Sequence, residues 1–308
     1  MNVPNPRISV LITFLVASFL YLYRDVFAKL INDWSIDENY SHGFLVIPIA
    51  LYLAWERRHQ FVTAPRRPVT LGLLVAVMGL GMLLAGILGA EVFTTEVSML
   101  ATLAGSILFL FGWSHLRVMM FPIAFLLLMI PLPSIIFNQI TFPLQLLASQ
   151  FGESALVLAG IPVLREGNVI HLANTSLAVA EACSGIRSLI SLLTLGIVYG
   201  YFMDSRSWAR VIIATSTVPV AIVTNGFRVA GTGVAAHYFG VAAAEGFFHE
   251  FSGWLVFVSA FAILLALHRG LVWMLPQAPP KQAGDGTATP SGSTETRTEQ
   301  RKKWQLES

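Results

Sequence analysis

Cysteine and charge are both scarce in this chain. Cys183 is the single cysteine among 308 residues, so an intramolecular disulfide is excluded. Charged residues make up 12% of the sequence and hydrophobic residues 55%, whereas soluble domains contain about 25% charged residues. The formal net charge of +2, with basic residues clustered in short loops, gives no sign of a nucleic-acid-binding protein. The composition therefore predicts an all-α polytopic membrane protein.

Several enzyme motifs are missing as well. No His, Cys, Asp or Glu residues show the spacing of metal ligands, and His249-Glu250 lacks the second histidine of a zinc-protease motif. The segment Gly231-Thr232-Gly233 is too short for a phosphate-binding loop, and no G-x-S-x-G is present. The sequence therefore predicts neither a metal nor an organic cofactor.

Apolar runs separated by polar or basic loops predict about eight transmembrane helices. Basic clusters at 56–67, 115–117, 206–210 and 268–269 are typical of cytoplasmic loops, which places both termini in the cytoplasm. Residues 1–276 would form the membrane domain, and residues 277–308, rich in Pro, Gly, Ser and charge, a disordered cytoplasmic tail. The expected spans are 8–23, 44–55, 70–89, 97–111, 118–130, 185–202, 211–224 and a last one that ends at 268.

Three segments are expected on the outer side of the membrane without crossing it. Residues 138–160 carry polar side chains that would be costly against lipid, which predicts an amphipathic helix in the outer interface. Residues 161–172 contain two β-prone runs around a Glu-Gly-Asn turn and predict a β-hairpin. Residues 229–246, rich in Gly and Ala, predict a dipping or interfacial helix. This arrangement brings Cys183 to the outer face.

The surroundings of Cys183 favour a reactive thiol. Ser184-Gly185 is typical of a helix start, and Arg187 follows in the first turn. Thiolates are stabilised at helix N-termini and beside cations, so the pKa of this thiol would be lowered. The structural alternative is a buried cysteine that acts as a small apolar residue.

Two further residues occupy comparable positions at outer ends of predicted spans. Arg228 follows the predicted span 211–224, and His249 precedes the last span. Taken alone, each has an ordinary explanation: Arg228 complements a helix C-terminus, and His249 beside two phenylalanines is an interfacial residue. Together with Cys183 they supply nucleophile, base and cation, which is the set needed for acyl transfer through a thioester. Water as acceptor gives a protease, and an amine gives a transpeptidase.

Four residues are candidates for supporting roles, and each has a structural alternative. His42 lies near the start of the second span and is a candidate for lining the same cleft, although a helix cap by Ser41 explains this segment equally well. Glu181 is placed to orient His249 or a substrate amine, or to cap the following helix. Asn225 is placed to orient an imidazole or to form a helix-end hydrogen bond. Arg187 would act through its charge on the thiol.

Four segments together resemble the exosortase/archaeosortase family. The resemblance implies an eight-span cysteine transpeptidase of the bacterial inner membrane, with its active site facing the periplasm. Its partners would be the lipid bilayer and exported proteins with a C-terminal sorting signal, namely a Pro-Glu-Pro-like motif, a transmembrane helix and an Arg-rich tail. By the family pattern Cys183 is the nucleophile and Arg228 and His249 complete the triad, with His249 typical of a bacterial enzyme. The segments are Ser41-His42-Gly43-Phe44-Leu45-Val46, Glu181-Ala182-Cys183-Ser184-Gly185-Ile186-Arg187-Ser188, Asn225-Gly226-Phe227-Arg228-Val229 and Gly246-Phe247-Phe248-His249-Glu250-Phe251-Ser252-Gly253-Trp254.

Two other classes of function compete with this one. A transporter or flippase would use an outer-facing polar cluster, with Arg228 binding an anionic or sugar substrate. Transporters often contain inverted repeats with paired broken helices, and no convincing internal repeat is present here. A structural assembly factor is the third class. The sequence indicates neither an oligomeric state nor the acceptor of the acyl group.

Overall fold

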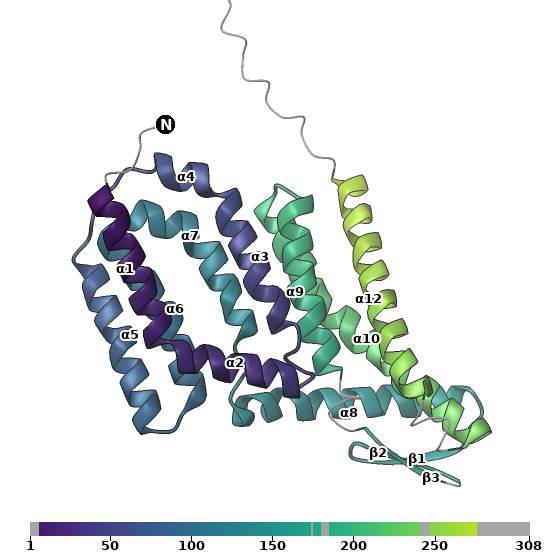
Figure 1. The fold of residues 1–308 in the computed structure, drawn as a ribbon. Coiled ribbons are helices and arrows are strands. Elements are labelled where there is room, and N and C mark those ends of the chain that lie inside the picture. The colour runs from purple at the N-terminus through teal and green to yellow at the C-terminus, as the bar shows by residue number, and fades with distance from the viewer. Residues whose placement is uncertain (1–5, 174, 180–184, 241–246, 276–308) are drawn as a thin grey trace, which may run out of the picture. The chain divides into compact units, whose positions relative to one another are not determined.

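A computed structural model of the chain describes residues 6–173, 175–179, 185–240 and 247–275. The chain divides into two units, 1–267 and 268–308; of the second, only the end of α12 and Leu275 are described. Helices dominate, with one small sheet (Figure 1). The elements are α1 (Pro6–Leu22), α2 (Arg24–Ile36), α3 (Gly43–Glu56), α4 (Arg58–Thr63), α5 (Leu71–Leu88), α6 (Val92–Leu110), α7 (Trp113–Phe125), the 3₁₀ helix η1 (Leu126–Met129), α8 (Ser134–Leu158), β1 (Val163–Glu166), β2 (Val169–Leu172), β3 (Thr175–Ala178), α9 (Ile186–Met203), α10 (Ser207–Phe239) and α12 (Phe247–Met274).

The lengths and compositions of these helices confirm an all-α polytopic membrane protein. Within the described residues, α5, α6, α9, α10 and the 251–274 part of α12 are each long and apolar enough to cross a bilayer. The helices 113–129 and α8 pass the same test as a pair but bend by 78° where they join. The shorter apolar helices α1 and α3 accompany them. Five or six candidate spans are thus identified, and the predicted number of eight is not confirmed.

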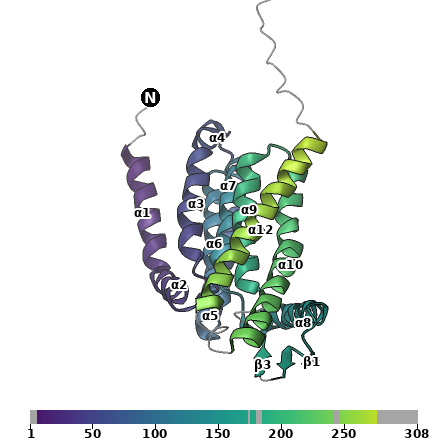
Figure 2. The same cartoon turned by 90° about the vertical axis from the view of Figure 1, so that its right-hand side faces the viewer.

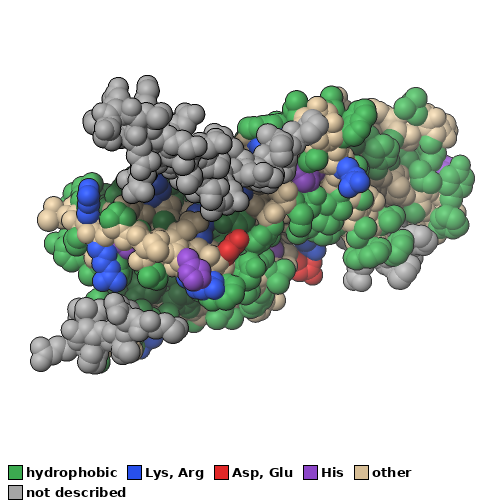
Figure 3. Space-filling view, turned by 90° about the horizontal axis from the view of Figure 1, so that it is seen from above, with side chains coloured by type: hydrophobic (Ala, Val, Ile, Leu, Met, Phe, Trp, Pro, Cys, Tyr) green, Lys and Arg blue, Asp and Glu red, His purple; other side chains and the backbone are tan. Residues whose placement is uncertain are grey.

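Three of the loops predicted to be cytoplasmic, 56–67, 115–117 and 206–210, lie together at one end of the first unit. Arg57 donates from Nε to the Tyr201 hydroxyl (3.0 Å) and from Nη1 to the Val118 carbonyl (2.9 Å), and Arg210 lies over the Tyr201 ring. These contacts join the basic loop 56–67 to the start of α7 and to the turn between α9 and α10. In Figures 1 and 2 this end lies opposite α8 and the strands, and Figure 3, a view onto it, shows basic side chains (blue) among hydrophobic ones (green). The membrane orientation itself stays a prediction.

Close packing of α5 against α6 uses the small residues of the expected span 70–89. A Cβ added to Gly72 would lie 2.2 Å from the backbone nitrogen of Phe109. Since only glycine leaves room at this crossing, the two backbones pack directly on each other, which is typical of small-residue contacts between membrane helices.

Helix α8 has the features predicted for an interfacial helix. It lies across the ends of the long helices (Figures 1 and 2). The polar residues that interrupt its apolar pattern contact the sheet region: Gln145 accepts a hydrogen bond from Asn168 (3.1 Å), and Ser149 donates to the Gly167 carbonyl (3.0 Å). Glu153 pairs with Arg165 at 2.8 Å. These polar side chains therefore hold the sheet against α8. The location of α8 in the membrane interface stays a prediction.

The predicted β-hairpin 161–172 is present and is extended by a third strand. β1 pairs with β2 around a two-residue turn in which Gly167 has φ +63°, and β2 pairs with β3, all antiparallel. Ile170 of β2 is fully buried with Leu156 of α8 and Val229 of α10. Strand β3 was not predicted because its Thr-Ser-Leu-Ala sequence has few β-branched or aromatic residues.

The predicted break between a span at 211–224 and a dipping helix at 229–246 is wrong for the described residues. α10 is one continuous helix of 33 residues, about 50 Å long, compared with a hydrocarbon core of about 30 Å. Gly226 does not break the helix, because the Phe151 ring packs directly against it, where a Cβ would otherwise lie. Arg228 thus lies inside a helix, and the explanation that it complements a helix C-terminus is excluded. Residues 241–246 lie outside the described part.

Candidate active site

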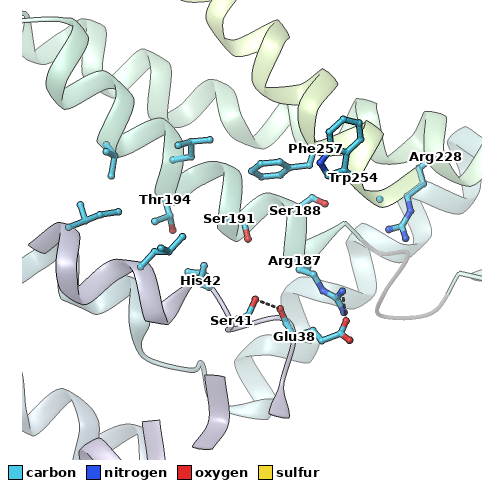
Figure 4. Close-up of a pocket in the computed structure, with 15 residues that line it drawn as sticks. Glu38, Ser41, His42, Arg187, Ser188, Ser191, Thr194, Arg228, Trp254 and Phe257 are labelled. Carbon is cyan, nitrogen blue, oxygen red and sulfur yellow. Dashed lines mark hydrogen bonds and ion pairs between the residues drawn. The ribbon is translucent and has the colours of Figure 1, made fainter. Parts of the chain in front are cut away.

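A cavity of about 930 Å³ opens between α3, α9 and α12 (Figure 4). One wall is apolar and includes Leu45 and Ile49 of α3, and the α12 wall carries Trp254 and Phe257. Its volume is at the upper end of the range for ligand pockets. The polar side chains that line it are Glu38, Ser41, His42, Arg187, Ser188, Ser191, Thr194 and Arg228.

Arg228 connects α10 to the beginning of α12 beside this cavity. The residue is 9% exposed. Its Nε lies 3.4 Å from the Ser252 hydroxyl, to which it donates, and its Nη2 would be 3.5 Å from a Cβ on Gly253. A buried guanidinium within a helix long and apolar enough to cross a membrane is costly unless it has a function or a partner, so this position is a functional candidate on physical grounds.

The catalytic candidates on the neighbouring segments are only partly described. Cys183 and Glu181 lie outside the described residues. His249 lies in the first turn of α12, one turn before Ser252, and its side chain also lies outside the described part. The predicted roles of these three residues stay predictions.

Gly185 holds the chain that follows Cys183 against α10. It has φ +80° and immediately precedes α9, and a Cβ added to it would lie 2.8 Å from Cγ of the buried Asn225. Asn225 lies one helical turn before Arg228. The start of α9, the middle of α10 and the start of α12 therefore meet through two contacts, Gly185 with Asn225 and Arg228 with Ser252.

Replacing Gly185 with alanine tests this close contact. Gly160 offers a matched control because its φ is +78° and no heavy atom lies within 4 Å of its Cβ position. Both variants place alanine in a left-handed backbone conformation, which lowers the stability by about 1 kcal/mol. Only Gly185→Ala also displaces Asn225. We expect a clearly larger drop in melting temperature, measured in detergent, for Gly185→Ala than for Gly160→Ala. Equal drops in melting temperature for the two variants would contradict the contact between Gly185 and Asn225.

Arg187 lies at the mouth of the cavity and forms an ion pair that the sequence did not predict. Its Nη1 lies 2.5 Å from Oε2 of Glu38, in the loop after α2 (Figure 4). Glu38 belongs to the acidic segment 33–40, and this acidic character marks it as a candidate. Composition alone, however, did not link this segment to α9. The Ser188, Ser191 and Thr194 hydroxyls were also missed, although their spacing puts them on one face of α9.

His42 lines the cavity near the start of α3, as predicted for the cleft. Its Nε2 lies 3.0 Å from the Leu128 carbonyl, and burial lowers the pKa of His42 despite hydrogen bonds to backbone carbonyls. The Ser41 hydroxyl donates to the Glu38 carbonyl at 3.1 Å, and no side chain caps α3. The alternative that Ser41 caps this helix is therefore wrong.

The residues present offer acid–base and electrostatic chemistry. Among the described residues, no group of three His, Cys, Asp or Glu side chains is arranged to hold a metal ion. The cavity instead combines two guanidinium groups, a histidine and hydroxyls with an apolar wall. This combination suits a ligand that is largely apolar and carries a carbonyl or anionic group at one end.

Comparison with known proteins gives one match. A protein-family model described as a transmembrane exosortase matches residues 34–266, well over half of the chain. The matched range includes every residue that lines the cavity. No curated protein and no solved structure matches the chain.

Proposed function

The chain belongs to the transmembrane exosortase family, and we propose that it is a membrane-embedded cysteine endopeptidase/transpeptidase. Its substrates are exported proteins that end in a sorting signal made of a Pro-Glu-Pro-like motif, a transmembrane helix and an Arg-rich tail. The observation that carries the proposal is the meeting of three segments beside one cavity. Gly185, two residues after Cys183, packs against Asn225, and Arg228 bonds Ser252, three residues after His249.

The proposed reaction proceeds through a thioester. The Cys183 thiolate attacks the carbonyl carbon of the scissile peptide bond, and the thiol proton passes to His249. Arg228 stabilises the negative charge that develops on the carbonyl oxygen. When the tetrahedral intermediate collapses, the C–N bond breaks and the amine leaves with the proton from His249. Water or an amine then attacks the thioester, which releases the acyl group and regenerates the thiol.

The length of α10 supports an active site at the outer surface. Arg210 and Arg228 are eighteen residues apart in this helix, which corresponds to about 27 Å. The hydrocarbon core of a bilayer is about 30 Å thick. With Arg210 in the first turn of α10, at its predicted cytoplasmic end, Arg228 is expected at the periplasmic boundary of a bacterial inner membrane. A substrate anchored by one transmembrane helix presents the residues ahead of that helix at the same depth.

A reporter assay tests the proposed function directly. The full-length chain is reconstituted in proteoliposomes with a folded reporter protein that ends in the sorting signal. We expect a shortened product that has lost the helix and tail, with the cleaved bond identified by mass spectrometry. A reporter that keeps the helix but has a scrambled motif serves as control and should remain uncut. Absence of product from the intact reporter, together with transport of a labelled solute, would favour the transporter instead.

A further inference from the structure

Arg187 is held at the cavity mouth by a carboxylate that is easily replaced. The Glu38 side chain is 75% exposed and that of Arg187 41% exposed, and exposed ion pairs of this kind contribute little to stability. Arg206 provides a contrast within the same chain, because it binds the fully buried Asp204 carboxylate through Nε (3.0 Å) and Nη2 (2.7 Å). A two-point interaction of that type fixes an arginine, whereas the contact with Glu38 does not.

The guanidinium of Arg187 also has bonding capacity that Glu38 does not use. Its Nε is buried and, within the described residues, has no hydrogen-bond partner. Arginine binds carboxylates most strongly when Nε and one terminal nitrogen donate together. A second carboxylate that replaces Glu38, with the Arg187 side chain turned so that Nε also faces it, would therefore gain a better interaction than Glu38 has.

The part of α9 that follows Arg187 and lines the cavity is suited to binding a peptide backbone. Ser188 and Ser191 line the cavity, and their hydroxyls make no hydrogen bond among the described residues, whereas the Thr194 hydroxyl donates to the Ile190 carbonyl at 2.9 Å. A peptide bond that is to be cleaved must leave the helical conformation, and at membrane depth its free N–H and C=O groups need partners. The two serine hydroxyls supply such partners, opposite the apolar wall of α3.

We propose that Arg187 binds an acidic side chain of the substrate peptide and so determines specificity, and that Glu38 occupies this guanidinium until the substrate displaces it. This inference rests on the proposed function. A peptide is favoured over an anionic lipid because the same cavity holds both the serine hydroxyls and Arg228, next to the segments that carry the reaction. The role differs from the predicted charge effect of Arg187 on the Cys183 thiol.

Two reporters that differ only by Glu or Gln at one position ahead of the transmembrane helix test this inference. With the wild-type chain, we expect kcat/KM to favour the Glu reporter by at least about tenfold, as for a hydrogen bond between charged groups. Arg187→Gln should bring this ratio to about one. Glu38→Gln should lower KM for the Glu reporter by about threefold, since no resident carboxylate competes. Glu166→Gln is the matched control, because Glu166 lies on β1 and does not line the cavity.

The outcomes separate this inference from the proposed function. If the wild-type chain cleaves neither reporter, the proposed function fails. If it cleaves both equally, or if Arg187→Gln keeps the preference, only the inference on Arg187 is overturned. A shift in the pH dependence of Cys183 alkylation in Arg187→Gln, with the preference kept, would assign Arg187 to thiol activation. Activity that requires anionic lipid in wild type but not in Arg187→Gln, with an unchanged Glu/Gln ratio, would assign it to a lipid headgroup and also overturn the inference.

Discussion

Cys183→Ala is expected to abolish cleavage of the sorting-signal reporter, with a loss of at least about 10⁴-fold, because the thioester cannot form. The measurement is product formation by the full-length protein in proteoliposomes, followed by gel and mass spectrometry. Cys183→Ser should be nearly as inactive, since a hydroxyl is a much weaker nucleophile at neutral pH. Melting temperatures of both variants are the control for folding. Full processing by Cys183→Ala would exclude the thiol mechanism.

The single cysteine makes the intermediate and its location accessible to experiment. Because no other thiol is present in the 308 residues, a thiol-reactive probe reports on Cys183 alone. Wild-type protein incubated with reporter should retain the shortened reporter as an adduct that hydroxylamine releases, as expected for a thioester. A membrane-impermeant reagent should label Cys183 in intact cells, which places it on the outer face. Labelling only after detergent is added would contradict that location.

The parts of the fold that the sequence predicted correctly are those set by local patterns. The turn at Gly167 and its β-prone flanks identify the hairpin, and the polar positions of 138–160 identify a helix with a polar face that contacts the sheet. Both depend on residues close in sequence, whose spacing determines which face they share. Gly72 of the expected span 70–89 is a further local feature, since it admits the backbone of α6.

The parts that were missed depend on tertiary contacts. Asn225-Gly226 is typical of a helix end, yet α10 continues, because Phe151 of α8 packs on Gly226 and the buried Asn225 faces Gly185. Glu38 and Arg187 are far apart in the sequence and both are partly exposed, so neither residue indicates that the other is its partner. Sequence patterns thus singled out several segments that line the cavity, whereas the cavity itself, with its serine-lined wall, followed only from the arrangement of α3, α9 and α12.

Arg228→Gln is expected to lower the rate of thioester formation by about 10²–10³-fold, the usual effect of removing one donor to a developing oxyanion. The single-turnover rate, with the protein in excess over the reporter, measures this step separately from release of the acyl group. Arg228→Lys should restore only part of the activity, since an ammonium group lacks the planar set of donors. Arg165→Gln is the control for loss of one positive charge, because Arg165 of β1 pairs with Glu153 of α8 and does not line the cavity.

The contact of Arg228 with Ser252 allows its structural and catalytic contributions to be separated. Ser252→Ala removes the 3.4 Å hydrogen bond but leaves the guanidinium in place, so we expect a loss of only about 1 kcal/mol in stability and a modest change in rate. If Arg228 acts on the oxyanion, Arg228→Gln slows thioester formation while the pH dependence of Cys183 alkylation stays close to wild type. If the alkylation profile instead shifts to higher pH, the buried cation acts mainly by stabilising the thiolate. Wild-type rates in Arg228→Gln would remove this residue from the reaction altogether.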